Sequence, residues 1–138
     1  MSFGYDIQHA VSVCVSDPGA DVSLPIWQVP AGVTKIEILE AACVTGTSLA
    51  AGTTNGIEAT LLDGGAAGAG TAALTNTLGG TDAGGTFPAW TAVTPQTWTI
   101  SEGTLDAGDW VVLKYNESGT VAPLNFVVWF SYVQGVGA

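Results

Sequence analysis

Few side chains of this sequence are suited to acid–base or nucleophilic chemistry. His9 is the only histidine, Cys14 and Cys43 are the only cysteines, and Lys35 and Lys114 are the only basic residues, with no arginine. A Ser-His-Asp triad would have to use His9, yet the chain has no G-x-S-x-G turn to present a serine. His9 is in phase with the valines of a predicted first strand. We therefore expect a packed histidine and no catalytic one.

Two pairs of aspartates lie close enough in the sequence to suggest glycosidase or calcium chemistry. Asp17 and Asp21 form one pair, and Asp106 and Asp109 form the other. Glycoside hydrolysis needs a carboxylic acid of raised pKa across a sugar cleft from a second carboxylate, and Ca²⁺ needs about six to eight oxygen ligands. Both pairs lie in turn sequences, where aspartate usually caps its own backbone. We therefore predict no enzyme, no catalytic residue, no cofactor and no metal site.

The overall charge excludes two classes of partner. The 138 residues carry 12 carboxylates against two lysines, so the formal net charge is -10. Such a surface repels phosphate backbones and anionic lipid headgroups. The sequence has no apolar run of about 18 residues that would span a bilayer. We expect no nucleic-acid partner and no membrane partner.

The hydrophobic content points to self-association. Hydrophobic residues make up 47% of the chain and charged residues only 10%. Such an excess can be buried once in a core and again against other subunits or a scaffold. We therefore predict a homo-oligomer. A monomer with a surface of threonine, alanine and glycine is the alternative.

The secondary structure is predicted from hydrophobic alternation of period two, in short blocks bounded by Gly, Pro and Asp. The predicted strands cover residues 7–16, 22–29, 33–44, 57–62, part of 71–78, 90–100, 110–115 and 124–133. Pro25 marks the second strand as an edge or irregular strand, and residues 116–119 read as the turn of a final hairpin. Together these features predict an all-β protein: a single-domain antiparallel β-sandwich over residues 1–138, as an eight-stranded jelly roll.

Side-chain positions follow from the same alternation. In residues 33–44, period two places Ile36, Ile38, Ala42 and Val44 on one face. The last strand, 124–133, is apolar on both faces, so we expect it to be covered on both faces. The N-terminal sequence shows no secretory signal, which favours two reduced, buried cysteines.

Aromatic residues supply the candidate partner contacts. Trp98, Trp110 and Trp129 fall inside predicted strands and are expected in the core or an interface. Trp27 and Trp90 lie beside prolines at loop margins, where each is a candidate anchor for a partner or a platform for stacking a sugar. Phe3 and Tyr5 are further candidate contacts on a short N-terminal arm of about residues 1–6. The Gly/Ala-rich segment 64–85 is predicted to be a contact loop.

The C-terminal third resembles the closing strands of trimeric jelly rolls. The segments Leu105–Leu113 and Asn125–Val133 are similar to the end of the C1q and tumour-necrosis-factor heads. Taken whole, the chain more closely resembles the small decoration, or cement, proteins of tailed bacteriophage heads. This second resemblance rests on chain length, an initiator Met without a signal, strand blocks rich in Ala, Gly, Thr and Val, and the segments Pro30–Ile36 and Leu105–Asp109.

The decoration-protein resemblance implies a viral structural protein on the outer capsid surface of the virion, made in the host cytoplasm. It implies a homotrimer that binds the major capsid protein and bridges neighbouring capsid subunits. The resemblance transfers no functional residue to this chain. A carbohydrate- or receptor-binding head, as a fibre tip or binding module, is the alternative, with Trp27 and Trp90 as its platforms.

Overall fold

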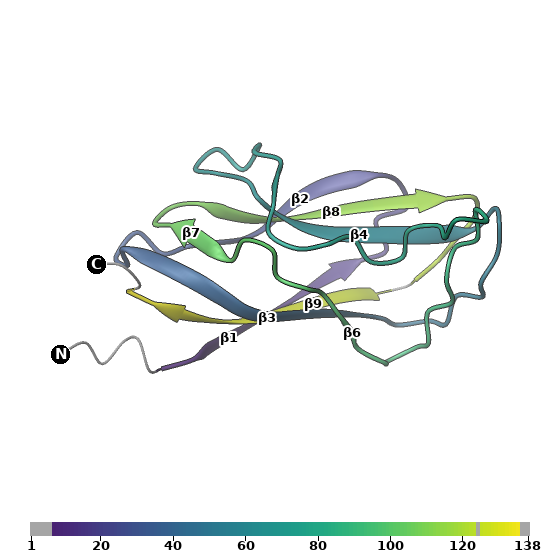
Figure 1. The fold of residues 1–138 in the computed structure, drawn as a ribbon, viewed down its shortest axis with the longest axis horizontal. Coiled ribbons are helices and arrows are strands. Elements are labelled where there is room, and N and C mark those ends of the chain that lie inside the picture. The colour runs from purple at the N-terminus through teal and green to yellow at the C-terminus, as the bar shows by residue number, and fades with distance from the viewer. Residues whose placement is uncertain (1–6, 124, 136–138) are drawn as a thin grey trace.

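The protein is an antiparallel β-sandwich of two sheets packed face to face (Figure 1). The computed structural model describes residues 7–123 and 125–135. Sheet A has the order β1 (His9–Ser16), β9 (Asn125–Gln134), β3 (Lys35–Thr45) and β6 (Gln96–Thr97), and β7 (Thr104–Asp106) also pairs with β3. Sheet B has the order β2 (Val22–Gln28), β8 (Trp110–Ser118), β4 (Gly56–Asp63) and β5 (Ala72–Ala73). The predicted all-β antiparallel sandwich is confirmed.

Most connections between strands cross from one sheet to the other. β1 to β4 alternate between sheet A and sheet B, and β5 stays in sheet B, where it pairs with β4. β6 and β7 both border β3, opposite Ala42–Cys43 and opposite Lys35–Glu37 respectively, so they share one edge of sheet A. β8 and β9 lie in different sheets, so the predicted final hairpin is wrong. Residues 116–118 continue β8 because β4 pairs with it as far as Gly56↔Ser118.

The second strand, β2, is irregular and lies at a sheet edge. β2 lies at the edge of sheet B, and its register against β8 shifts between Pro25 and Trp27. The predicted irregular edge strand is therefore confirmed. Proline lacks the backbone donor that an inner strand needs, which explains its place at an edge.

A β-bulge in β3 changes which residues face the core. The register runs from Ile38↔Tyr132 directly to Glu40↔Ser131, so Leu39 is an extra residue on β3. One extra residue reverses the alternation that follows it. Ala41 and Cys43 therefore join the core. The prediction that Ala42 and Val44 share a face with Ile36 and Ile38 is wrong for this reason.

Two predicted segments contain only short regular strands. Within residues 90–100 only β6 is regular strand, and Trp90 forms an isolated bridge with Leu49. The Gly/Ala-rich segment 64–85 packs on its own sandwich. The Leu74 amide donates to Leu61 O at 2.9 Å, and the Leu78 amide donates to Ala59 O at 2.9 Å. The prediction of a strand within 71–78 is confirmed by β5 (Ala72–Ala73), which pairs with β4. The contact role of segment 64–85 stays a prediction.

The core lies between the inner faces of the two sheets. Phe126, Val128 and Phe130 of β9 face inward, and Phe126 meets Tyr115 of β8 edge-on at a centroid distance of 5.7 Å. The β4 side chains Ile57, Ala59 and Leu61 complete the opposite layer and are fully buried. Alternation along three long strands thus produces one continuous apolar layer.

We predict that position 79 tolerates only glycine, because the core leaves no space there for a side chain. Gly79 has a φ of +85°, and a Cβ there would clash with the Ile57 carbonyl and approach Trp90 Cζ2 to 2.9 Å. Gly79→Ala should lower the free energy of unfolding by about 2 kcal/mol or more, because backbone strain and a clash add. Denaturant unfolding measures this loss.

Gly85 is the matched control, because it has a φ of +78° with open space around the Cβ position. Gly85→Ala should cost only the strain, about 1 kcal/mol. Equal losses for the two variants would contradict the clash at Gly79.

Candidate functional site

The lone histidine belongs to an aromatic cluster at the edge between β1 and β2. The His9 ring stacks on Tyr132 at a centroid distance of 5.1 Å and an interplanar angle of 19°. Trp27 packs against Tyr132 at 5.1 Å and edge-on against Phe130 at 5.3 Å. The expectation of a packed histidine is confirmed. The cluster closes one side of the sandwich, and Trp27 keeps a partly exposed surface there.

The other predicted contact residues are distributed differently. Trp90 is only 3% exposed and meets Phe126 edge-on at 6.2 Å inside the core. Its bridge with Leu49 holds the backbone over the core, so Trp90 is not an exposed anchor or platform, and that expectation is wrong. Trp27 remains a predicted contact. Phe3 and Tyr5 lie outside the described residues.

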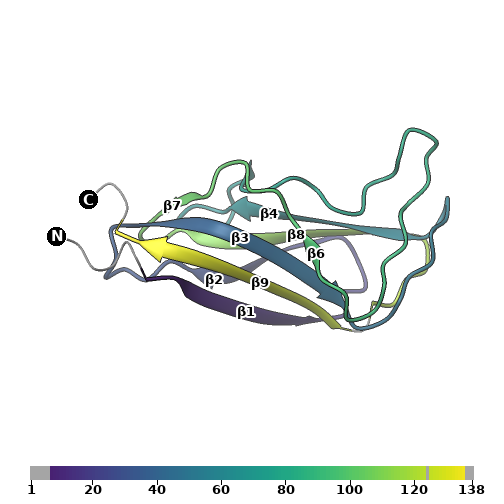
Figure 2. The same cartoon turned by 60° about the horizontal axis from the view of Figure 1, so that its bottom comes forward.

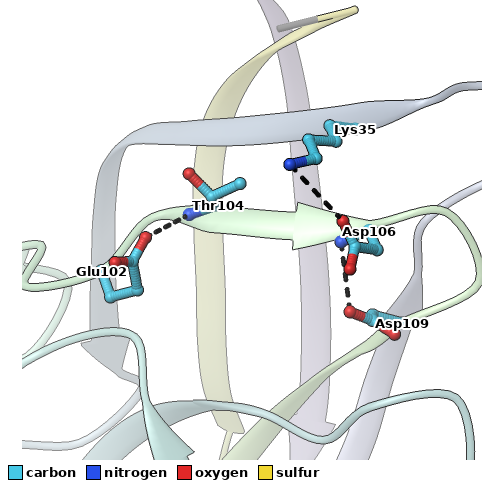
Figure 3. A network of polar contacts seen from close by, with 5 residues as sticks. All are labelled: Lys35, Glu102, Thr104, Asp106 and Asp109. Carbon is cyan, nitrogen blue, oxygen red and sulfur yellow. Dashed lines mark hydrogen bonds and ion pairs between the residues drawn. The ribbon is translucent and has the colours of Figure 1, made fainter. Parts of the chain in front are cut away.

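The Asp106–Asp109 pair stabilises a turn. Asp109 Oδ2 accepts a hydrogen bond from the Asp106 amide at 3.1 Å, and Glu102 Oε1 accepts one from the Thr104 amide at 3.2 Å (Figure 3). Lys35 Nζ lies 4.0 Å from Asp106 Oδ1, with both side chains exposed. Carboxylates that cap backbone amides in open solvent do not form the enclosed acid and base that glycoside hydrolysis requires.

The Asp17–Asp21 pair is also structural, and its members act separately. Asp17 Oδ1 accepts from the Gly19 amide at 3.1 Å within the turn. Asp21 Oδ1 accepts from the Glu117 amide of β8 at 2.8 Å, which ties the start of β2 to sheet B. The predicted turn role is confirmed for Asp17, whereas Asp21 makes a long-range contact.

An acidic hollow of about 200 Å³ lies beside this contact and includes Asp21, Glu58 and Glu117 in its lining. The buried Tyr115 hydroxyl donates to Glu117 Oε2 at 2.8 Å. Burial raises the pKa of Tyr115 well above its ordinary value, and the hydrogen bond and negative charge of Glu117 raise it further. Across residues 7–123 and 125–135, no three His, Cys, Asp or Glu side chains gather as metal ligands do.

A larger surface hollow of about 580 Å³ lies at one end of the sandwich. Its lining comes from residues 48–55 and 120–122, which include hydroxyl and amide side chains but no charged or aromatic residue. Asn55 Oδ1 accepts from the Thr120 amide at 3.0 Å and joins the two segments. The hollow offers hydrogen-bonding groups without a nucleophile paired with a base.

The outer surface of sheet A is the strongest candidate for an interaction site. Its centre is a set of uncharged side chains in two cross-strand rows, which we call the outer patch: Ser12, Trp129 and Ala42 in one row, and Cys14, Val127 and Val44 in the other. Trp129 and Val127 are partly exposed. No described loop crosses the middle of β1, β9 and β3 in the view that brings this surface forward (Figure 2).

The outer patch qualifies one expectation about β9. Sheet B covers the inner face of this strand, but Val127, Trp129 and Val133 on its outer face remain partly exposed. The expected cover on both faces is therefore not supplied by the described part of this chain. The apolar residues on both faces of 124–133 were the sequence signal for this site. The positions of Ala42 and Val44 in it could not be predicted, because the bulge at Leu39 reverses the alternation of β3.

The two cysteines lie on opposite faces of sheet A. Cys14 is opposite Val127 in the outer patch and is exposed, whereas Cys43 is opposite Val128 in the core. Both thiols are free. Burial raises the pKa of the Cys43 thiol well above its ordinary value. The expectation of a buried thiol is confirmed for Cys43 and is wrong for Cys14, because Cys14 occupies an outward position of an edge strand.

Comparisons with known proteins add no assignment: the sequence matches no protein-family model, and no curated protein matches it. The described parts of the chain contain no helix long and apolar enough to cross a membrane.

The thiol arrangement predicts selective labelling. In dilute native protein, a thiol reagent should modify Cys14 and leave Cys43 unmodified, because only Cys14 is accessible and Cys43 strongly favours the protonated form. Mass spectrometry of the labelled peptides measures this. Denatured protein should label at both positions, and added reductant should leave the melting temperature unchanged. No labelling of Cys14 in the native state would contradict the structure.

The Tyr115–Glu117 bond predicts a pH effect on stability. Above about pH 10, unfolded tyrosine loses its proton while buried Tyr115 retains it, so stability should fall as pH rises. In Tyr115→Phe, this fall should be shallower by up to about 1.4 kcal/mol per pH unit. Denaturant unfolding at a series of pH values measures the slope. At pH 8 the variant should lose about 1 kcal/mol with its hydrogen bond. Identical slopes would contradict the assignment.

Proposed function

We propose that this protein is a non-enzymatic structural protein that binds the outside of a bacteriophage capsid and stabilises it by bridging subunits of the major capsid protein. The observation that carries the proposal is the outer patch, because uncharged side chains on the sheet of a protein whose net charge is -10 suit contact with other protein subunits, which a bridging protein requires. A rigid sheet face presents preformed contact area at low entropic cost.

The contacts that the candidate catalytic side chains make support a role without catalysis. Asp17, Asp106 and Asp109 are engaged in turns, His9 stacks in an aromatic cluster, and Cys43 is buried in the core. Enzymes instead gather such groups within hydrogen-bonding reach of one another in a cleft.

The topology supports the finer prediction of a jelly roll. Sheet A runs β1-β9-β3-β6 and sheet B runs β2-β8-β4-β5, and β6 and β7 share one edge. Counting that edge once gives four strands in each layer, the strand number of a double-sheet jelly roll. We include in the proposal a homotrimer located on the virion, with no nucleic-acid or membrane partner.

The alternative function is a carbohydrate- or receptor-binding head. The uncharged hollow lined by residues 48–55 and 120–122 favours it, because its hydroxyl and amide groups suit neutral polar ligands. The burial of Trp90 removes one of the two expected stacking platforms. Trp27 remains the other.

Capsid binding is predicted to depend on the N-terminal arm. Deletion of residues 1–6 should weaken co-sedimentation with capsids of the encoding phage by at least about tenfold, because the arm contributes Phe3 and Tyr5 and burial of one such ring is worth about 1.5–3 kcal/mol. The sandwich should remain folded.

The full-length double variant Phe3→Ser/Tyr5→Ser is the matched control, because it keeps the length of the arm. It should reproduce most of the loss. Binding as tight as that of the unmodified chain in both variants would reject the arm as an anchor. Binding of the unmodified chain to glycans but not to capsids would favour the alternative function.

A further inference from the structure

We propose that the outer patch on sheet A is the self-association surface of this protein and that a second copy of the same chain docks on it, with Trp129 as the central anchor. The inference rests on the homo-oligomer included in the proposed function, and it does not depend on capsid binding.

The first argument is the arrangement around Trp129. Trp129 lies between Ser12 on β1 and Ala42 on β3, and Ala42 in turn lies opposite Thr97 on β6. Trp129 is partly exposed between these small neighbours, and Ala42 is fully buried beside it. Interface hot spots are enriched in tryptophan and lie near the centre of the contact, which is the position of Trp129 in its row.

The second argument is that the chain covers the comparable surface of sheet B by itself. Val112 on the outer side of β8 is 1% exposed, because Gly64 lies so close that a Cβ there would be 2.5 Å from Val112 Cγ2. Gly68 lies over Pro25 in the same way, because a Cβ there would be 3.3 Å from Pro25 Cγ. Residues 64–70 thus form a cover on sheet B. In the outer patch only Ala42 is fully covered by the described residues, whereas the other five side chains remain exposed or partly exposed.

The third argument is charge. Two copies that each carry a net charge of -10 repel one another, so they can approach closely only where carboxylates are absent. β1 and β9 contain no charged residue, and the charges of β3 (Lys35, Glu37 and Glu40) all precede Ala42 and Val44. The six residues of the outer patch include no carboxylate, and Glu40, opposite Ser131, lies at its border on the same side of sheet A. The outer side of sheet B carries Lys114 and Glu58.

The edges of the two sheets give a fourth, independent argument. β2 is protected against pairing with another chain by Pro25 and its register shift. β1 is the end strand of sheet A and has eight residues with no proline and no charge. Long, uncharged edges of this kind favour association. β1 contributes Ser12 and Cys14 to the outer patch, so the unprotected edge and the uncharged face are continuous.

The available area fits a weak contact between two copies. Three strands (β1, β9 and β3) at a spacing of about 4.8 Å, over the eight paired residues of β1 at about 3.4 Å each, give a flat area of roughly 400 Å² per copy. Two copies together bury roughly 800 Å², which is in the range of weak, reversible interfaces.

A matched pair of serine substitutions tests the proposal. Ser12 and Ser23 are both exposed residues in edge strands. Ser12 lies opposite Trp129 in the outer patch, whereas Ser23 lies opposite Lys114 on sheet B. Ser12→Glu and Ser23→Glu add the same charge to the two sheets. Sedimentation equilibrium of the free full-length chain measures association, so the result does not depend on capsids.

The unmodified chain should sediment as a multiple of 13.9 kDa. Ser12→Glu should raise the dissociation constant by at least about tenfold, because it buries a carboxylate at the centre of the contact. Ser23→Glu should leave the constant unchanged within about twofold. An unmodified chain that stays monomeric to about 100 µM would overturn the proposal, as would equal effects of the two substitutions.

A second measurement needs no variant and therefore does not depend on whether Ser12→Glu folds. The rate of Cys14 labelling in the unmodified chain should fall as protein concentration rises through the association range, because a docked copy covers the thiol. A labelling rate independent of concentration in an oligomer would place the contact elsewhere. Loss of capsid binding with association intact would reject the proposed function and leave this inference standing.

Discussion

The pairing of β9 along both of its edges is the constraint on which the rest of the structure depends. β1 pairs with one edge from Ser16↔Asn125 to His9↔Tyr132, and β3 pairs with the other from Thr45↔Phe126 to Ile36↔Gln134. This central position directs Phe126, Val128 and Phe130 into the core and, by the same alternation, directs Val127 and Trp129 outward. The alternating residues of β9 therefore supply both the apolar inner face and the apolar outer face of sheet A.

The bulge at Leu39 determines which residues of β3 face the core and which face outward. Without the extra residue, the stretch after Ile38 would direct Ala42 and Val44 inward and Cys43 outward. With it, Ala42 lies next to Trp129 and Val44 next to Val127, while Ala41 and Cys43 pack in the core. One inserted residue therefore completes the core and assembles the uncharged surface together.

Charge and hydrogen bonding in this protein serve the architecture. The described aspartates cap turns or join strands, as when Asp21 accepts from the Glu117 amide of β8. The ion pair between Lys35 and Asp106 is long and exposed, so it adds little stability. The remaining negative charge keeps copies of the chain apart wherever carboxylates face solvent. Close contact between two copies is thereby favoured on surfaces that lack carboxylates, such as the outer patch.

The sequence by itself determined the fold class, because alternation of period two and the turn residues between strands are local signals. It also determined the scarcity of histidine, cysteine and lysine, the edge position of the strand that holds Pro25, and the two-sided apolar character of β9. The tertiary structure decided which strands pair, because long-range pairing depends on the packing of both sheets: β8 and β9 are neighbours in sequence yet lie in different layers. It also decided the burial of Trp90 through its bridge with Leu49, and the opposite orientations of Cys14 and Cys43. The outer patch itself combines residues from β1, β3 and β9, and only the register of those strands, with its one bulge, brings them together.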